Sequence, residues 1–201
     1  MQDDLELLGR WRDGDKRAGR ELFERHFDAL YRFFSSKLSG DVEDLIQVTF
    51  LACIERRKSI QNFRGYLFGT ARNVLCGHFA ERKRGHQFDP VESSLEDLDP
   101  SPSAVLAGLD EGKLLATLLR RLPLDMQLLL ELHYWEGLTH PELAEAMSFS
   151  EGCVKGKIAA AKLRLRTTLQ TLAKEHGLKT LSLIDLEQWR TSLRRPAGSS
   201  H

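Results

Sequence analysis

Apolar residues recur at helical spacing along almost the whole chain, and no stretch shows the alternation typical of a half-buried strand. Glycine, serine and proline interrupt this pattern, so the sequence predicts an all-α protein. In the first half it predicts helices over about 3–12, 16–38, 41–57 and 63–84. The second helix carries a broad stripe that we expect to be buried, made of Leu22, Phe23, Phe27, Leu30, Tyr31 and Phe34.

The helix predicted over 41–57 begins with acidic residues. We expect Gly40 to stop the preceding helix and Asp41 to act as the N-cap of this one. Its first turns gather Asp41, Glu43, Asp44 and Gln47, whereas its buried side should consist of Leu45, Ile46, Phe50 and Ile54. Acids at this end favour the helix dipole, and the same carboxylates would also suit a basic partner surface.

The helix predicted over 63–84 has two different faces. Leu67, Ala71, Val74, Leu75 and His78 share one face, and the opposite face gathers Tyr66, Asn73 and Arg84 with Arg72 and Lys83 at its flank. Aromatic rings can stack on bases while cations follow the phosphate backbone. This mixture therefore suits single-stranded nucleic acid.

The stretch from Leu122 to Arg166 is typical of a helix-turn-helix. Thr139 and Glu142 have the spacing of a capping box, and Pro141 suits the first turn of a helix that should reach Met147. Ser148 and Phe149 form the turn, and Ser150 is a suitable N-cap for the second helix. That helix has a stripe expected to be buried, made of Val154, Ile158, Ala161 and Leu165.

The second of these helices exposes basic residues on its outer arc. They are Lys155, Lys157, Lys162, Arg164 and Arg166. The pattern fits a recognition helix in a DNA major groove, although a solvated basic face would look the same. The face opposite the buried stripe carries only Gly152, Gly156, Ala159 and Ala160. Because these cannot bond base edges, we expect phosphate contacts with weak direct base readout.

The net charge of zero hides an uneven distribution. Residues 1–84 hold 16 basic and 13 acidic residues, residues 85–112 hold seven acidic and no basic ones, and residues 113–201 hold 13 basic and nine acidic ones. The acidic segment also has three prolines and predicts a flexible linker, with a helix beginning near Ser103. It is either a solvated tether or a mimic of nucleic acid that lies against basic surfaces.

Several classes of protein and site are disfavoured. No apolar run is long enough to span a bilayer and the N-terminus lacks the features of a signal peptide, so we expect a cytoplasmic protein without membrane insertion. Cys53, Cys76 and Cys153 lack metal-ligand spacing and are expected to be small buried residues. The histidines fall singly, and no catalytic pair or triad has usable spacing, so we expect no metal, no cofactor and no enzyme activity.

Two blocks of sequence, in order and separated by a linker, carry a family resemblance. They are ALYRFFSSKLSGDVEDLIQVTFLACIERR with FRGYLFGTARNVLCGHFAERKR, and LRRLPLDMQLLLELHYWEGLTHPELAEAMSFSEGCVKGKIAAAKLRLR. Over about Leu7 to Leu169 the chain resembles the extracytoplasmic-function sigma factors of bacterial RNA polymerase. The resemblance implies a region 2 domain over 1–85, a linker over 86–112, a region 4 domain over 113–175 and an extension over 176–201.

The resemblance also implies roles for particular residues. Binding to the beta-prime clamp helices of core RNA polymerase would involve Asp41, Glu43, Asp44, Gln47 and Phe50. Binding to the minus-10 promoter element would involve Arg64, Tyr66, Arg72, Asn73, Lys83 and Arg84. Binding to the minus-35 element would involve Thr139, Lys155, Lys157, Ala159, Lys162 and Arg166. The region 4 domain would also meet the beta flap of the polymerase.

Three stretches depart from the family pattern. In the recognition helix, members of the family usually carry Ser, Arg, His and Arg where this chain has Gly156, Lys157, Ala159 and Ala160. The segment between Arg57 and Phe63 is shorter than in most members, which affects the expected pocket for a flipped minus-10 base. The extension from Gly177 can form a short amphipathic helix that begins at Ser182 and contains Trp189. That helix would fold back on Leu122–Leu132 or dock on a protein such as an anti-sigma factor.

The sequence thus predicts a sigma factor that is a monomer when free and directs core polymerase to a subset of promoters. Two alternatives remain. One is a free-standing helix-turn-helix regulator that binds operators as a dimer, and the other is a sigma-like interaction protein that titrates polymerase or an anti-sigma factor.

Overall fold

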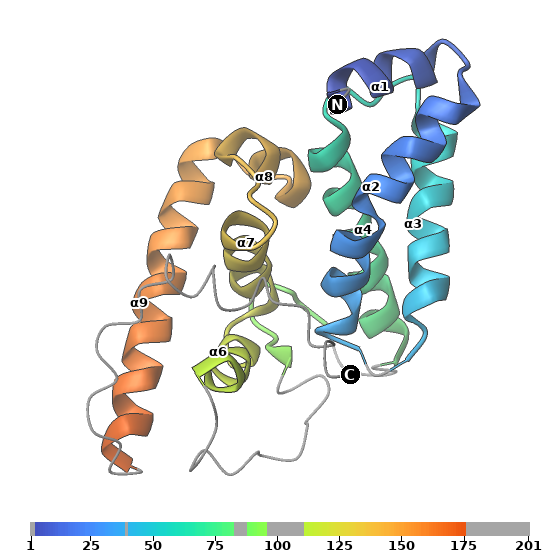
Figure 1. The fold of residues 1–201 in the computed structure, drawn as a ribbon. Helices are drawn as coiled ribbons and strands as arrows, with labels where there is room; N and C mark the ends of the chain where they lie inside the picture. Colours follow the sequence, from blue (N-terminus) through green and yellow to red (C-terminus); the bar gives the residue numbers. More distant parts are fainter. Residues whose placement is uncertain (1–2, 39, 83–87, 96–110, 176–201) are drawn as a thin grey trace, which may run out of the picture. The chain divides into compact units, whose positions relative to one another are not determined.

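The computed structural model describes residues 3–38, 40–82, 88–95 and 111–175. These residues form helices joined by short turns (Figure 1), and their only β pairing is an isolated bridge between Ser94 and Pro123. The all-α prediction is confirmed. Lys83, Arg84, the helix expected near Ser103 and the C-terminal helix expected from Ser182 lie outside the described residues.

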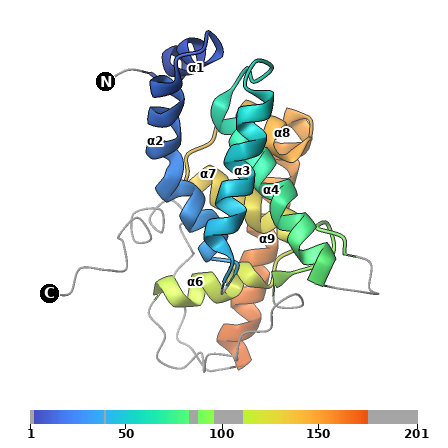
Figure 2. The same cartoon turned by 90° about the vertical axis from the view of Figure 1, so that its right-hand side faces the viewer.

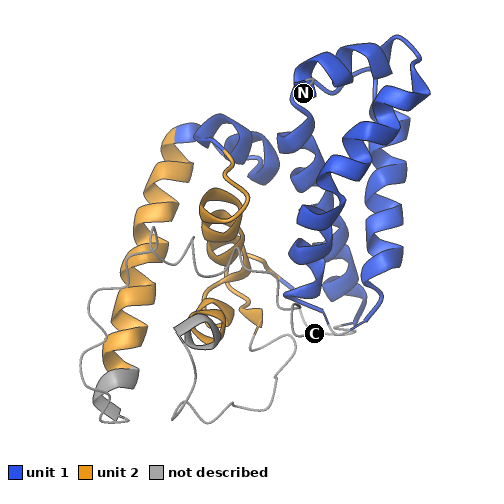
Figure 3. Ribbon diagram, in the orientation of Figure 1, with its two compact units in different colours: residues 1–88, 139–151 blue, residues 89–138, 152–201 orange. Residues whose placement is uncertain are grey.

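The chain divides into two compact units (Figure 3). Unit 1 comprises Met1–Phe88 and Thr139–Glu151, and unit 2 comprises Asp89–Leu138 and Gly152–His201. The first helix of the predicted helix-turn-helix therefore groups with the N-terminal helices. The sequence-based domain boundaries placed that helix in the second domain, residues 113–175. Division by contacts instead places it with the first unit.

Unit 1 contains α1 (Asp4–Arg12), α2 (Lys16–Ser35), α3 (Val42–Arg56), α4 (Phe63–Arg82) and α8 (His140–Met147). Helices α2, α3 and α4 lie side by side in both views (Figures 1 and 2) and pack against one another, while α1 packs on α2. The core lies between these helices and includes Leu7, Leu22, Leu30, Phe34, Ile46, Leu67, Ala71 and Leu75, all less than 3% exposed.

Two expectations about unit 1 are wrong. Asp41 has φ 60° and ψ 12°, a left-handed conformation, and its side chain makes no capping bond to α3. An N-cap residue normally has extended backbone angles, and the left-handed conformation of Asp41 does not provide that geometry. Phe27, Tyr31 and Ile54 are 41%, 45% and 40% exposed rather than buried. The neighbouring helices cover only part of the apolar stripe of α2, so Phe27 and Tyr31 remain at the surface. Ile54 is on the side of α3 that faces away from the core.

Unit 2 contains α6 (Glu111–Arg120), α7 (Leu124–Tyr134) and α9 (Glu151–Glu175), and α6 packs on α7. Helix α7 is buried nearly all round through leucines. The predicted stripe of α9 is confirmed, since Val154, Ile158, Ala161 and Leu165 are at most 6% exposed. Helix α9 continues well past Arg166, and the buried Leu169 extends the same stripe.

The described part of the predicted linker, residues 88–95, is held against the start of α7. The backbone N–H of Leu124 donates to the carbonyl of Ser93 (2.9 Å), and that of Asp125 donates to the carbonyl of Pro90 (3.0 Å). The N-cap of α7 is Pro123, whose side chain has no acceptor, so the first N–H groups of the helix need other partners. The linker carbonyls supply them, so this part of the linker lies against the first turn of α7.

Candidate docking and nucleic-acid surfaces

Helix α3 presents an outer face that mixes acidic, polar and apolar side chains. Asp44, Gln47, Leu51 and Ile54 follow one another at spacings of three and four, which places them on one side of the helix. All four are exposed, and Leu51 is 58% exposed. Glu43 and Val48 flank this face and are also exposed. We call these six residues the α3 outer face.

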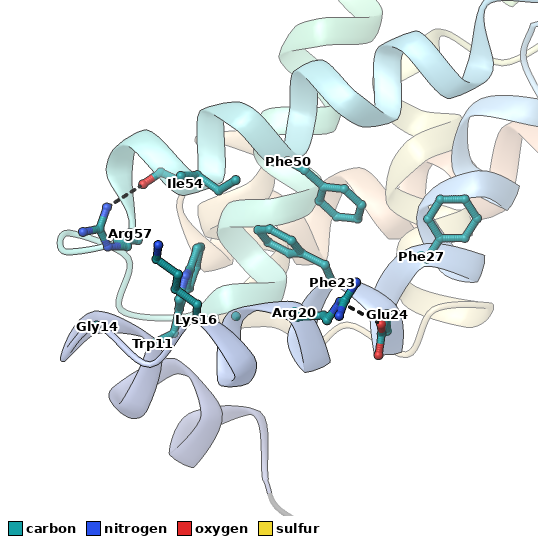
Figure 4. A pocket seen from close by; sticks show the side chains of 11 residues that line it. Trp11, Gly14, Lys16, Arg20, Phe23, Glu24, Phe27, Phe50, Ile54 and Arg57 are labelled. Atoms are coloured by element: carbon teal, nitrogen blue, oxygen red, sulfur yellow. Dashed lines mark hydrogen bonds and ion pairs between the residues drawn. The ribbon is translucent and has the colours of Figure 1, made fainter.

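An apolar groove lies beside this face, between α2 and α3, and Trp11 of α1 and Gly14 of the α1–α2 turn complete its lining (Figure 4). Its volume is about 650 Å³. Phe50 of α3 stacks on Phe23 of α2 with ring centroids 4.4 Å apart, and Trp11 meets Phe23 edge-on at 5.3 Å. Lys16, Arg20 and Arg57 bring positive charge to its lining. Glu24 also lines the groove and pairs with Arg20 at 3.4 Å, so the aromatic residues lie beside a charged rim in which cations outnumber the single carboxylate.

The α3 outer face and the groove have the chemistry of a protein-binding surface. Large apolar side chains that cluster in water mark interaction sites, and aromatic anchors beside a polar rim are typical of them. The structure places the predicted Glu43, Asp44, Gln47 and Phe50 along this one helix. Val48 and Leu51 were missed from sequence. The sequence contained a signal for them: apolar residues lie on more than one side of α3, and a single buried face cannot cover them all, so some must be exposed.

Helix α4 positions the residues predicted to meet the minus-10 element. Asn62 begins the helix by accepting the N–H of Gly65 at its side-chain oxygen, 3.2 Å away. Arg64, Tyr66 and Arg72 are half-buried and Asn73 is exposed. Partial burial restricts the rotamers of the three larger side chains. They therefore have more defined positions than fully solvated side chains would have.

Cys53 anchors α3 against α4 and has no reactive character. Burial raises the pKa of its thiol to about 12, and a hydrogen bond with Thr70 opposes this only in part. A thiol with so high a pKa stays protonated at neutral pH. The predicted burial of Cys53 is confirmed, whereas Cys76 and Cys153 are half-buried. Within the described ranges no group of three or more His, Cys, Asp or Glu side chains could hold a metal ion.

A part-buried cluster of Asp4, Arg25 and His26 links α1 and α2 near the start of α4. His26 Nε2 lies 2.6 Å from Asp4 Oδ2, and Arg25 donates to Asp4 Oδ1 at 2.7 Å. Burial lowers the pKa of His26, although Asp4 opposes this effect. Burial acts to raise the pKa of Asp4, but hydrogen bonds and charge from Arg25 and His26 outweigh it and lower that pKa.

The exposed outer arc predicted for α9 is confirmed except at Lys157. Gly152, Gly156, Ala159 and Ala160 are exposed and offer no side-chain hydrogen bond to a base. Lys155, Lys162, Arg164 and Arg166 are exposed, and Lys157 is half-buried. The ammonium of Lys162 lies 4.9 Å from the centroid of the Tyr134 ring, which is a cation–π contact.

The predicted capping box at the start of α8 is confirmed. The N–H of Glu142 donates to Thr139 Oγ1 at 3.4 Å, and the N–H of Thr139 donates to Glu142 Oε2 at 2.8 Å. Thr139 was predicted to touch minus-35 DNA, and it belongs to unit 1, whereas the basic residues of α9 belong to unit 2. Glu142 Oε1 lies 3.5 Å from Arg64 Nη1 of α4, which brings two predicted DNA-reading segments together.

Comparison with known proteins gives the same two blocks as the sequence. The family model for Sigma-70 region 2 matches residues 22–85, and that for Sigma-70 region 4 matches residues 113–165. The sigma factor SigF of Caulobacter vibrioides, an ECF RNA polymerase sigma factor, is 33% identical over 174 residues, which cover 83% of this chain and 90% of SigF. The chain belongs to the ECF RNA polymerase sigma factors.

Two other ECF sigma factors match at lower sequence identity. SigL of Mycobacterium tuberculosis is 29% identical over 76% of this chain and 89% of its own length. BldN of Streptomyces coelicolor is 30% identical over 75% of this chain, and the match spans 60% of BldN. The whole length of BldN is thus not represented in this chain.

Solved structures share the fold of this sigma factor. CnrH in complex with the cytosolic domain of CnrY matches with a TM-score of 0.60 at 24% identity, over 84% of this chain and 97% of CnrH. RpoE in complex with the anti-sigma factor NepR from Bartonella quintana matches with a TM-score of 0.56 at 20% identity, over 75% and 96%. Among the described residues, no helix has the length and apolarity needed to cross a membrane.

Proposed function

We propose that this sigma factor is a dissociable subunit that docks on core RNA polymerase through the α3 outer face and directs it to a subset of promoters. The beta-prime clamp helices would contact Glu43, Asp44, Gln47 and Phe50, and the beta flap would contact the region 4 segment. The observation that carries this proposal is the α3 outer face, where Leu51 and Ile54 stand exposed beside carboxylates. Exposed apolar side chains are unfavourable in water, so burying this face against a partner lowers the free energy.

In this proposal α4 holds the minus-10 element through Arg64, Tyr66, Arg72 and Asn73, and α9 contacts the minus-35 element through its basic arc. Neither helix carries enough charge to hold DNA alone, because affinity for DNA grows with the number of phosphates neutralised. When polymerase fixes both readers at one spacing, the second contact becomes intramolecular and gains effective concentration. The free chain is a monomer in the cytoplasm and binds DNA weakly.

Catalysis belongs to the polymerase in this proposal, and the sigma factor has no enzyme activity of its own. An anti-sigma factor is a further proposed partner. Two structural relatives were solved in complexes, RpoE with the anti-sigma factor NepR and CnrH with the cytosolic domain of CnrY. The groove lined by Trp11, Phe23 and Phe50 is an apolar surface that such a partner could cover.

The proposal is tested by run-off transcription with core RNA polymerase on genomic fragments that include the region upstream of the chain's own gene. The double variant Asp44→Arg, Gln47→Ala should bind core at least about tenfold more weakly and lose the transcripts, because it removes charge and hydrogen bonding from the docking face. Arg56→Glu is the matched control. Arg56 is exposed on the other side of α3 from Asp44 and Gln47, so reversing its charge should leave core binding and the transcripts unchanged.

A titrating interaction protein is the second candidate, and the exposed glycines and alanines of α9 favour it. It predicts tight binding to core with no transcript from any fragment. If the chain does not bind core at all and instead forms a dimer that binds an operator, a free-standing regulator is the correct function. If transcription depends on the chain and the double variant still supports it, α3 is not the docking helix.

A further inference from the structure

The groove between α2 and α3 is a recess of the size that holds a small molecule. Its volume of about 650 Å³ lies within the range of about 300–1,000 Å³ that is typical of ligand pockets. The most buried part of its lining is aromatic, since Trp11 is 6% exposed and Phe23 and Phe50 are half-buried. Phe27 and Ile54 also line it and are exposed. The recess therefore leaves apolar surface open to a ligand.

A missing side chain shapes one wall of the groove. A Cβ added to Gly19 of α2 would overlap the indole of Trp11, so this ring lies directly on the α2 backbone. The indole also meets Phe23 and Phe63 edge-on, with ring centroids 5.3 and 6.1 Å away. Because this packing fixes the ring, the aromatic wall is formed before a ligand arrives, which lowers the cost of binding.

Two cations from different helices stand at one end of the groove. Lys16 is the first residue of α2 and Arg57 is the C-cap of α3, and Figure 4 shows both at the same end, beside Trp11. Among the described lining residues the only carboxylate is Glu24, and it pairs with Arg20. Lys16 and Arg57 form no ion pair within the described part of the chain. Cations brought together repel each other, and an anion between them removes that cost.

We infer that the groove is a binding site for a small amphipathic anion that is free in solution, such as a fatty acid. Its apolar body lies along Trp11, Phe23 and Phe50, and its acidic group lies between Lys16 and Arg57. The guanidinium of Arg57 can donate two parallel hydrogen bonds to a carboxylate, and the ammonium of Lys16 adds a point charge. An amphiphile with a cationic head meets the same rings but is repelled at this end of the groove.

An occupied groove competes with docking on core polymerase, and this part of the inference rests on the proposed function. Phe50 lines the groove and is also a predicted contact of the clamp helices. Ile54 likewise belongs both to the groove and to the α3 outer face. A ligand in the groove covers apolar surface that docking would bury. Binding of the ligand should therefore weaken core binding by mass action, in proportion to its saturation of the free chain.

The site is tested with decanoate as the probe and the full chain as the receptor. Decyltrimethylammonium is the matched probe, because it has the same chain length and a cationic head. Isothermal titration calorimetry below the micelle concentrations measures both affinities. The indole N–H resonance of Trp11, assigned from the spectrum of Trp11→Phe, reports whether the probe enters the groove.

The double variant Lys16→Gln, Arg57→Gln removes the two cations at the end of the groove. Arg17→Gln, Arg56→Gln is its control, since it makes the same change in net charge at the adjacent residues, which are exposed and do not line the groove. Decanoate should bind the wild type at least about fivefold more tightly than decyltrimethylammonium does. The first variant should weaken decanoate binding by about fivefold to tenfold, and the control by less than about twofold.

Equal affinity of the two probes, or equal losses in the two double variants, would overturn the anion site. Binding to vesicles of phosphatidylglycerol without binding of decanoate would overturn it too, because the surface would then be a membrane contact. Saturating decanoate should weaken binding of the wild-type chain to core by at least about fivefold. Decanoate in the groove with unchanged core binding would overturn the competition. A chain that does not bind core without decanoate is the separate failure of the proposed function, and the anion site is measured without core.

Discussion

The two helices predicted to read promoter DNA, α4 and α9, differ in what they offer a base. Helix α4 carries an aromatic, an amide and two guanidiniums, and three of these four side chains are half-buried. Helix α9 carries glycines and alanines on its outer arc, with lysines and arginines around them. The first helix has groups that can stack on and bond to bases in defined positions. The second has groups that attract any phosphate.

The difference implies a division of labour between the two promoter elements. Sequence discrimination should come mainly from α4, and α9 should supply affinity and register. Any preference at the minus-35 element should then follow the shape and flexibility of the DNA rather than contacts to base edges. Two predictions test this division, beginning with the largest expected effect, and a third concerns the stability of the fold around the start of α4.

Tyr66→Ala should reduce core-dependent initiation by about tenfold or more, because loss of one stacked base costs about 1–3 kcal/mol. Abortive and run-off transcription on one responsive promoter measures the change. Tyr66→Phe keeps the ring and should initiate at a rate close to that of the wild type. Equal activity of Tyr66→Ala and the wild type would remove α4 as the stronger reader.

Lys155→Ala should weaken promoter binding by the complete holoenzyme roughly twofold to fivefold and reduce the salt slope by about 1, since it removes one phosphate contact. Affinities for several promoter variants, measured at a series of salt concentrations, show whether the loss is uniform. A loss confined to particular minus-35 sequences would mean that α9 reads bases after all.

The folding stability of the chain should fall with pH because of His26, which packs beside the start of α4. The pKa of His26 is lowered from its ordinary value of 6.5 in the fold, so the unfolded chain binds more protons. Stability is therefore present above pH 6.5 and is lost as the pH falls through the lowered folded pKa. The His26 ring lies 5.4 Å from that of Phe63, the first residue of α4.

Urea unfolding of the full chain at pH 7.5 and at pH 5.5 measures this effect. The wild type should show a lower free energy of unfolding at the acid pH, and His26→Gln should show a smaller difference between the two pH values. The lowered pKa of Asp4 acts in a more acidic range, below its ordinary value of 3.8, and does not contribute in this window. A wild-type chain that is equally stable at both pH values would contradict the assignment to His26.

Local signals in the sequence predicted the helices and the main features of their ends. The capping box of Thr139 and Glu142 and the buried stripe of α9 depend only on neighbouring residues, and both are confirmed. The left-handed Asp41 was not predictable in the same way. Aspartate is a good N-cap by propensity, but the tight turn that precedes α3 determines its backbone angles.

Features that depend on packing between distant segments were not predictable from one sequence. Phe27, Tyr31 and Ile54 have helical spacing that fits a core, and only the arrangement of three helices decides which flank stays in water. Residues 88–95 have the composition of a linker, yet their carbonyls cap a helix some thirty residues later in the chain. The approach of α8 to Gly65 and Gly69 likewise requires knowledge of where α4 lies.

The most direct test of the account is transcription by core polymerase plus this sigma factor from a promoter library randomised at both the minus-10 and the minus-35 elements, with sequencing of the transcribed templates. The account predicts that transcripts need the chain, that the minus-10 positions are strongly selected, and that the minus-35 positions are weakly selected. Stronger selection at minus-35 than at minus-10, or transcripts that form without the chain, would contradict it.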